Sequence, residues 1–256
     1  MYPELSDVIQ VEADGPVRIV RLNRPDDLNA SNHELHEAMA DLWPHVSNDV
    51  ECRSVVLTGN GRAFSAGGDF NYLRELRADR ALRDITIATG KRLVLNMLQC
   101  RVPVVAAVNG PAAGLGCSLV ALSDMAYMAE SAHLSDPHVA VGLVAADGGP
   151  ITWPLHTSMM LAKEYAFTGD RISAERAAQI GLVNHVVPDT EVFDQAHACA
   201  HRIAKLPQYA VEMTKRVMNL HAERAVLATI DFALSAEYQS FDSDDLGAFL
   251  DRALGD

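Results

Sequence analysis

Two glycine-rich turns are the parts of this sequence best suited to bind negative charge. Residues Gly61–Asp69 (GRAFSAGGD) follow a β-branched stretch, and Asn109–Ser118 (NGPAAGLGCS) follow an apolar one. Each turn is expected to lead into a helix, whose first N–H groups have no acceptor within the helix. If the N–H groups of Gly68 and Leu115 face one point, they form an oxyanion hole, in which each donor contributes about 3–4 kcal/mol. A single turn of this kind is more often only a tight connection.

The elements around these turns alternate between strands and helices. A hairpin is expected to turn at Asp14-Gly15. Ser31 is expected to cap a helix, in a capping box with Glu34. One long helix is expected over 70–98. Further strands are predicted at 54–58, 103–108 and 125–129, and a helix from near 114. Alternation of this kind is typical of an α/β fold with right-handed crossovers.

From about residue 190 the pattern is helical, with helices predicted at 192–205, 209–222 and 225–238. We therefore expect an α/β core of residues 1–190, which carries the active site, and a helical region of residues 191–256. Such a region buries little surface alone. It is expected to pack on its own core or on a neighbouring subunit.

The composition excludes several classes of protein. A net charge of −13 argues against a nucleic-acid partner, which would need a basic surface. Four cysteines without a CxxC pair predict neither disulfides nor a zinc–cysteine site and fit a reducing cytoplasm. The N-terminal residues lack the features of a signal peptide, and no apolar run reaches membrane-spanning length.

The chain resembles the crotonase (enoyl-CoA hydratase/isomerase) superfamily along nearly its full length. The matching segments occur in the family's order: 23–30, 63–69, 103–110, 114–118, 167–174 and 177–183, with Pro207 and Lys215. The resemblance implies a ClpP-like spiral of ββα units and a C-terminal helical trimerisation region, in a homotrimer or a dimer of trimers. It also implies an oxyanion hole made by Gly68 and Leu115, an acyl-CoA substrate as in fatty acid metabolism, and no permanently bound cofactor.

The chain departs from the family at the two glutamates that hydratases use, because Ser118 and His138 stand in their places. Without two carboxyl groups the usual hydration mechanism is not available. The resemblance instead suggests that His138 moves the proton while Asp147 holds its imidazolium and fixes the tautomer. The alternatives are a structural loop histidine and an Asp147 that caps a helix from Gly148. Ser118 is kept as a residue that lines the site.

The contacts expected for coenzyme A are few. Relatives often carry a lysine where this chain has Asn71, and Arg62 with Ala66 are the remaining candidates for contacts with the nucleotide. Trp153 could line an acyl pocket, although core packing is the usual place of a tryptophan. Glu237 lies on a tail helix that approaches the active site in some relatives, but a solvated helix face is the expectation here.

Three functions remain open from the sequence. The first is an acyl-CoA isomerase, lyase or atypical hydratase that works through an enolate. The second is a C–C hydrolase for β-diketones that does not use CoA, because a similar His/Asp pair occurs in such relatives; their second histidine is Leu115 here. The third is a non-catalytic subunit.

His197 and His201 share one helix face, but no third metal ligand is evident and a surface role is expected.

Overall fold

A computed structural model describes residues 7–255 of the chain. Residues 1–6, on which part of the expectation about a signal peptide rests, lie outside the described residues. Within the described range, no helix combines the length and the apolar character needed to cross a membrane.

A six-stranded sheet forms the centre of the molecule, in the order β1-β2-β3-β4-β6-β9. The first pair is antiparallel and all later neighbours are parallel. The strands β3 and β4 are buried along their whole length, which explains why they appear in the sequence as continuous apolar runs. The strands are β1 (Ile9–Asp14), β2 (Val17–Leu22), β3 (Ser54–Gly59), β4 (Val104–Val108), β6 (Met125–Ala129) and β9 (His185–Val187).

A second sheet of three short strands lies beside the first, in the order β5-β7-β8. These strands are β5 (Ala112–Ala113), β7 (His133–Ser135) and β8 (Ile172–Ser173). Because β5 directly precedes α4 (Leu115–Leu122), this small sheet fixes the backbone of the second glycine turn.

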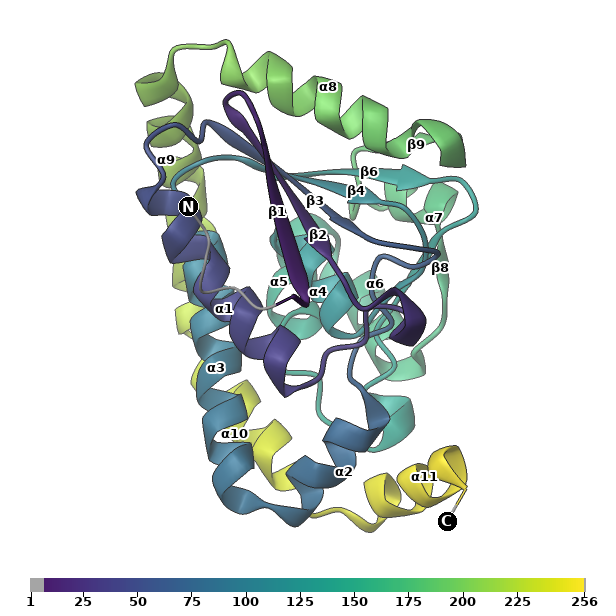
Figure 1. The fold of residues 1–256 in the computed structure, drawn as a ribbon. Coiled ribbons are helices and arrows are strands. Elements are labelled where there is room, and N and C mark those ends of the chain that lie inside the picture. Colours follow the sequence, from purple (N-terminus) through teal and green to yellow (C-terminus); the bar gives the residue numbers. More distant parts are fainter. Residues whose placement is uncertain (1–6, 256) are drawn as a thin grey trace.

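Helices cover both faces of the large sheet (Figure 1). Helix α8 (Val192–Ala204) lies across one face, against β3, β4 and β6, and α4 and α5 (Gly149–His156) lie on the other side. The remaining helices are α1 (His33–Asn48), α2 (Phe70–Ala78), α3 (Arg80–Leu98), α6 (Met159–Thr168), α7 (Ala174–Gln179), α9 (Gln208–Leu227), α10 (Ile230–Ser240) and α11 (Asp244–Leu254), with 3-10 turns at η1 (Pro25–Asp27), η2 (Val139–Val141) and η3 (Asp189–Glu191).

The predicted capping box at Ser31 is wrong by one residue. The N-cap of α1 is Asn32, whose side-chain oxygen accepts a hydrogen bond from the N–H of Leu35. Ser31 instead pairs with the first glycine turn, donating its N–H to the carbonyl of Gly67 at 2.6 Å. Ser31, which the sequence predicted as a helix cap, therefore lies against the first glycine turn.

The single helix predicted over 70–98 is two helices. Asp79 ends α2 with an extended backbone and begins α3, where its carboxylate accepts from the N–H groups of Ala81 and Leu82. The break turns α3 away from α2 (Figure 1). It leaves the short α2 free to form one wall of a cavity.

The chain after residue 191 is helical, as predicted, but α9 continues to Leu227 through the break expected at 223–224, and α11 is a further helix. Helices α10 and α11 return to the core. Helix α11 lies beside α2, where both contribute to a second apolar cluster: Tyr72, Leu76, Leu143, Phe241, Leu246 and Leu250. The C-terminal helices thus pack on their own core, one of the two arrangements expected. The boundary between core and helical region at residue 190 stays a prediction.

Candidate active site

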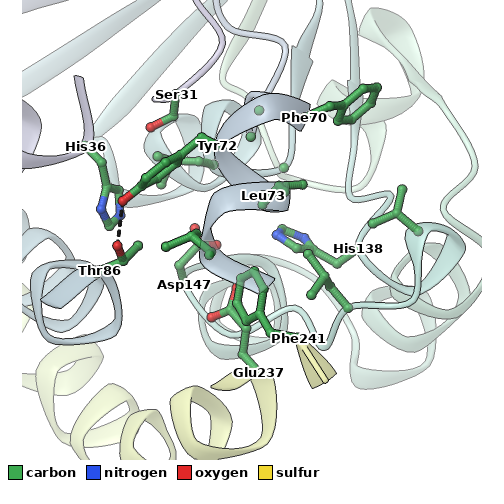
Figure 2. A pocket seen from close by; sticks show the side chains of 18 of the residues that line it. Ser31, His36, Phe70, Tyr72, Leu73, Thr86, His138, Asp147, Glu237 and Phe241 are labelled. Atoms are coloured by element: carbon green, nitrogen blue, oxygen red, sulfur yellow. Dashed lines mark hydrogen bonds between the residues drawn. The ribbon is translucent and has the colours of Figure 1, made fainter. Parts of the chain in front are cut away.

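A largely apolar cavity of about 410 Å³ lies between α2, α10 and the two glycine turns. Apolar side chains such as Leu73, Leu76, Val141 and Phe249 form most of its wall. Of the described residues that line it, none is lysine or arginine. The ionisable side chains that line the cavity are few, and three of them, His138, Asp147 and Glu237, come together at one end of it (Figure 2).

The two glycine turns lie against each other at this cavity. Gly67 has a φ of +90°, and a Cβ added there would approach the carbonyl oxygen of Ala113 to 2.9 Å. Gly114 has a φ of +48° and faces the backbone of Gly67. The N–H of Ala113 donates to the carbonyl of Ser65 at 2.9 Å, which ties the turns together. Glycine is required here because only it adopts this backbone at such close approach.

The N–H groups of Gly68 and Leu115 both belong to residues that line the cavity. Leu115 is the first residue of α4 and follows the N-cap Gly114, so its N–H has no acceptor within the helix. Among residues 7–255, no hydrogen-bond acceptor is seen for either N–H. Two free donors at one cavity are what an oxyanion hole requires.

His138 is paired with Asp136, not with Asp147. Its Nδ1 forms a short hydrogen bond with Oδ1 of Asp136, whose side chain is 2% exposed. The predicted role of Asp147 in fixing the imidazole tautomer therefore falls to Asp136. Burial lowers the pKa of His138, but the adjacent charge and hydrogen bond of Asp136, with weaker effects of Asp147 and Glu237, raise it to about 10. The side chain is then an imidazolium at neutral pH.

The other edge of the imidazole ring faces the second glycine turn. Its Cε1 lies 3.5 Å, and its Nε2 4.0 Å, from the position of a Cβ on Gly114. With Nδ1 held by Asp136, Nε2 is the nitrogen left for a substrate. His138 therefore carries a proton and a positive charge next to the free N–H of Leu115.

Asp147 approaches the same space from the segment before α5. It does not cap that helix, whose N-cap is Gly148 without a side-chain hydrogen bond. Its Oδ1 lies 3.3 Å from the hydroxyl of Ser118. Burial raises the pKa of Asp147, although the charge of His138 opposes this.

Glu237 does not lie on a solvated helix face, as the sequence predicted, because α10 turns it into the cavity (Figure 2). Burial, followed by repulsion from Asp147, raises its pKa to about 8. Two carboxyl groups with raised pKa values beside one imidazolium can hold and pass protons close to neutral pH.

The remaining predicted site residues lie in different places. Ala66 lines the cavity, whereas the side chain of Arg62 is exposed and outside it. Ser118 and Trp153 are both 1% exposed and do not line it. This contradicts the site-lining prediction for both residues, although core packing was the alternative given for Trp153. The hydroxyl of Ser118 lies 3.2 Å from the carbonyl oxygen of Gly114 and 3.3 Å from Oδ1 of Asp147, so it contacts Asp147 from outside the cavity. Trp153 is part of the main core.

The sequence analysis did not predict three further residues at the site: Asp136, His36 and Tyr72. Asp136 stands two residues before His138, and this spacing was the available signal. Far along the cavity, His36 and Tyr72 also line the wall, with the hydroxyl of Tyr72 2.5 Å from that of Thr86. Nothing in the sequence near these residues marks them.

Comparison with known proteins identifies the family of the chain. The sequence model described as enoyl-CoA hydratase/isomerase matches residues 12–252. A short-chain-enoyl-CoA hydratase of Clostridium acetobutylicum is 34% identical over 239 residues, covering 93% of this chain and 89% of that protein.

Among solved structures, an enoyl-CoA hydratase/isomerase from Mycobacterium paratuberculosis is 60% identical with a TM-score of 0.95, covering 97% of this chain and 99% of that one. A β-diketone hydrolase from the cyanobacterium Anabaena, bound to (S)-3-oxocyclohexyl acetic acid, is 27% identical with a TM-score of 0.87, covering 94% and 96%. The fold and the matched sequence together show that the chain belongs to the enoyl-CoA hydratase/isomerase (crotonase) family.

Proposed function

We propose that this protein is an acyl-CoA isomerase that moves a carbon–carbon double bond through an enolate of the thioester. One observation carries the proposal: two carboxyl groups with raised pKa values, Asp147 and Glu237, share a largely apolar cavity with the free N–H groups of Gly68 and Leu115. The family name refers to enoyl-CoA substrates, which supports a thioester as the substrate.

In the proposed reaction, the thioester carbonyl accepts hydrogen bonds from the N–H groups of Gly68 and Leu115. These donors stabilise the negative charge that develops when a proton leaves the carbon chain. The imidazolium of His138 adds a positive charge beside them. Asp136 keeps that charge in place, so it acts as a positioning residue.

Proton transfer is assigned to the carboxyl pair and not to His138. A base must be able to lose its proton near the working pH, and a pKa of about 10 leaves His138 protonated. Glu237, with a pKa of about 8, is much better matched to accept a proton from carbon. The same carboxyl, or Asp147 beside it, then returns the proton to another carbon of the enolate.

Isomerisation is preferred over hydration for a physical reason. The family's glutamate positions are occupied by Ser118 and His138, and Ser118 is buried behind Asp147, away from the cavity. Isomerisation needs only proton transfer between two carbons, and the apolar wall suits an acyl chain without a bound water.

The test is a product assay with 3-enoyl-CoA and 2-enoyl-CoA substrates of several chain lengths. Conversion of the 3-enoyl to the 2-enoyl thioester is expected, with little 3-hydroxyacyl-CoA formed. Incorporation of solvent deuterium at C4 of the 2-enoyl product, or at C2 of the recovered 3-enoyl substrate, would support the enolate. Hydration without isomerisation would contradict the assignment.

A second candidate is the hydrolysis of a C–C bond in a β-diketone. The pairing of His138 with a buried aspartate and the similarity to the Anabaena β-diketone hydrolase favour it. Here Asp147 or Glu237 would activate water, because the imidazolium cannot. Cleavage of a cyclic β-diketone, with no thermal stabilisation by acetoacetyl-CoA, would support this candidate and exclude the isomerase.

We also propose that the chain works as a homotrimer or dimer of trimers in the cytoplasm, with α9 at a subunit interface. The exposed apolar side chains on this helix support it: Tyr209, Met213, Val217, Met218, Leu220 and Leu227. Analytical ultracentrifugation would measure the oligomeric state. A monomer would contradict the proposal.

A further inference from the structure

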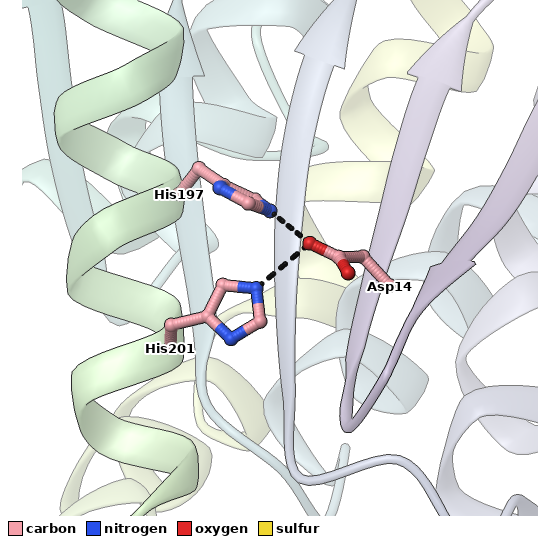
Figure 3. A group of neighbouring side chains, drawn as sticks. All are labelled: Asp14, His197 and His201. Atoms are coloured by element: carbon pink, nitrogen blue, oxygen red, sulfur yellow. Dashed lines mark hydrogen bonds and ion pairs between the residues drawn. The ribbon is translucent and has the colours of Figure 1, made fainter.

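Three side chains meet at one end of the β1–β2 hairpin, outside the cavity of the proposed active site (Figure 3). Asp14 is the last residue of β1, and His197 and His201 lie one turn apart on α8. The Nε2 atoms of both histidines lie 2.9 Å from the same carboxylate oxygen, Oδ2 of Asp14. The third ligand that the sequence did not reveal is thus supplied by a residue 187 positions away from His201.

One carboxylate oxygen holds both histidines. His201 forms a hydrogen bond with Asp14 through Nε2 at 2.9 Å. The buried Nε2 of His197 lies at the same distance from that oxygen, as an ion pair. A positive ion between the three donor atoms would give each of them a ligand bond of its own.

Neighbouring side chains hold the ring of His197 in place. Phe193 stacks on it with 5.5 Å between ring centroids and an interplanar angle of 16°. The guanidinium of Arg21, on β2, lies 4.8 Å from the centre of the Phe193 ring. The rings of His197 and His201 meet edge to face at 4.5 Å. The arrangement is therefore set before any ligand binds.

We propose that Asp14, His197 and His201 form a binding site for a divalent transition-metal ion of the zinc type. Donor atoms of all three residues lie within 4.8 Å of one another. Small adjustments would bring each to the ~2.0–2.2 Å that zinc requires from imidazole nitrogen and carboxylate oxygen. The side chains are 50%, 25% and 28% exposed, in the same order, so the ion can enter and water can complete its coordination.

The chemistry of the donors selects the class of metal. Two imidazoles and one carboxylate suit zinc, copper or nickel, whereas magnesium and calcium prefer oxygen ligands alone. The four cysteines are all buried, so they do not compete for the ion.

A bound ion would connect the hairpin to α8, the helix that covers one face of the sheet. Ligands that bind only the folded state raise its stability in proportion to the logarithm of their concentration. The site therefore offers metal-dependent stabilisation of the fold, separate from the proposed catalysis. It does not depend on which reaction the cavity performs.

The experiment uses the full chain, treated with EDTA, dialysed and titrated with ZnCl2 by calorimetry and thermal unfolding. Binding of one ion per chain and a rise in Tm are expected, with no response to MgCl2. Asp14→Ala and His201→Ala should each weaken zinc binding at least about tenfold, since even the loss of groups that support a ligand has an effect of this size. His221→Ala, a histidine on α9 far along the chain, is the matched control and should bind as the parent does.

Cobalt(II) provides a readout that does not rely on stability, because its visible absorption reports histidine coordination. The Tm of each variant without metal shows that it is folded. A parent protein that does not saturate with zinc overturns the proposal. Equal affinity in the parent and the two variants overturns it as well.

Discussion

The imidazole of His138 is held by the carboxylate of Asp136, two residues earlier in the chain and almost completely buried. Proline stands between them, and the N–H of His138 also faces Oδ1 of Asp136 at 3.4 Å. The pair places a positive charge beside the second glycine turn. Asp147 and Glu237, two carboxyl groups with raised pKa values, lie at the same end of the cavity.

Replacement of Asp136 by asparagine should remove the charge that stabilises the imidazolium. Burial then acts with less opposition, so the pKa of His138 is expected to fall well below about 10. We expect kcat to fall about 100-fold at neutral pH. An NMR titration of the histidine ring protons measures the pKa directly, and an unchanged titration in the variant would contradict the assigned pairing.

The rate is expected to depend on pH through the carboxyl pair. Because the base must be ionised, kcat/KM should rise with pH through an apparent pKa near 8, the value for Glu237. Glu237→Gln should lower kcat by about 100-fold or more and remove this rise. Glu164→Gln, an exposed position on α6, is the control. A parent profile that is flat between pH 6 and 9 would argue against Glu237 as the base.

His36 should make the protein sensitive to acid. Burial lowers its pKa to about 4, with the charge of Glu37 opposing and those of His33 and Arg92 adding to the shift. The folded state therefore resists a proton that the unfolded state accepts below about pH 6.5. Stability is present in full above that pH and is lost as the pH falls toward 4, by up to roughly 3 kcal/mol.

Urea unfolding of the parent and of His36→Gln at pH 7, 6 and 5 measures this effect. The difference in unfolding free energy between the two proteins should shrink as the pH falls, because only the parent loses this contribution. His221→Gln serves as the control. A constant difference across the three pH values would show that His36 is not the group responsible.

Gly67→Ala should damage both the fold and the oxyanion hole. The added Cβ meets the carbonyl oxygen of Ala113 at 2.9 Å, and the φ of +90° is strained for alanine. A loss of about 2–4 kcal/mol in unfolding free energy is expected from strain and overpacking together. Gly15→Ala is the matched control, since its φ is +55° but no atom lies within 4 Å of its Cβ. Equal losses in the two variants would mean that the contact between the turns contributes nothing.

Much of the fold was predictable because its signals are local. The buried strands β3 and β4 are continuous apolar runs, and the glycine-rich turns indicate close backbone contacts. The break at Asp79 was missed because a capping aspartate in the middle of a long helical pattern resembles a surface residue. The cap of α1 was misplaced since Ser31 and Asn32 are both good caps, and only pairing with Gly67 decides between them.

The candidate site was predictable only in part. Gly68, Leu115 and His138 line one cavity, and their roles there stay predictions. Asp136 could have been inferred from its spacing to His138. The place of Glu237 could not be inferred, because it depends on how α10 returns across the cavity. The sequence around a helix residue does not show which residues, more than 80 positions away, it will contact.

The contribution of α10 and α11 has a consequence for the order in which the protein matures. The residues that form the two glycine turns leave the ribosome long before Glu237 and the helix that packs beside α2. The cavity that both turns line is therefore incomplete until α10 and α11 have been made. Competence for the proposed reaction is expected late in synthesis, when these two helices dock.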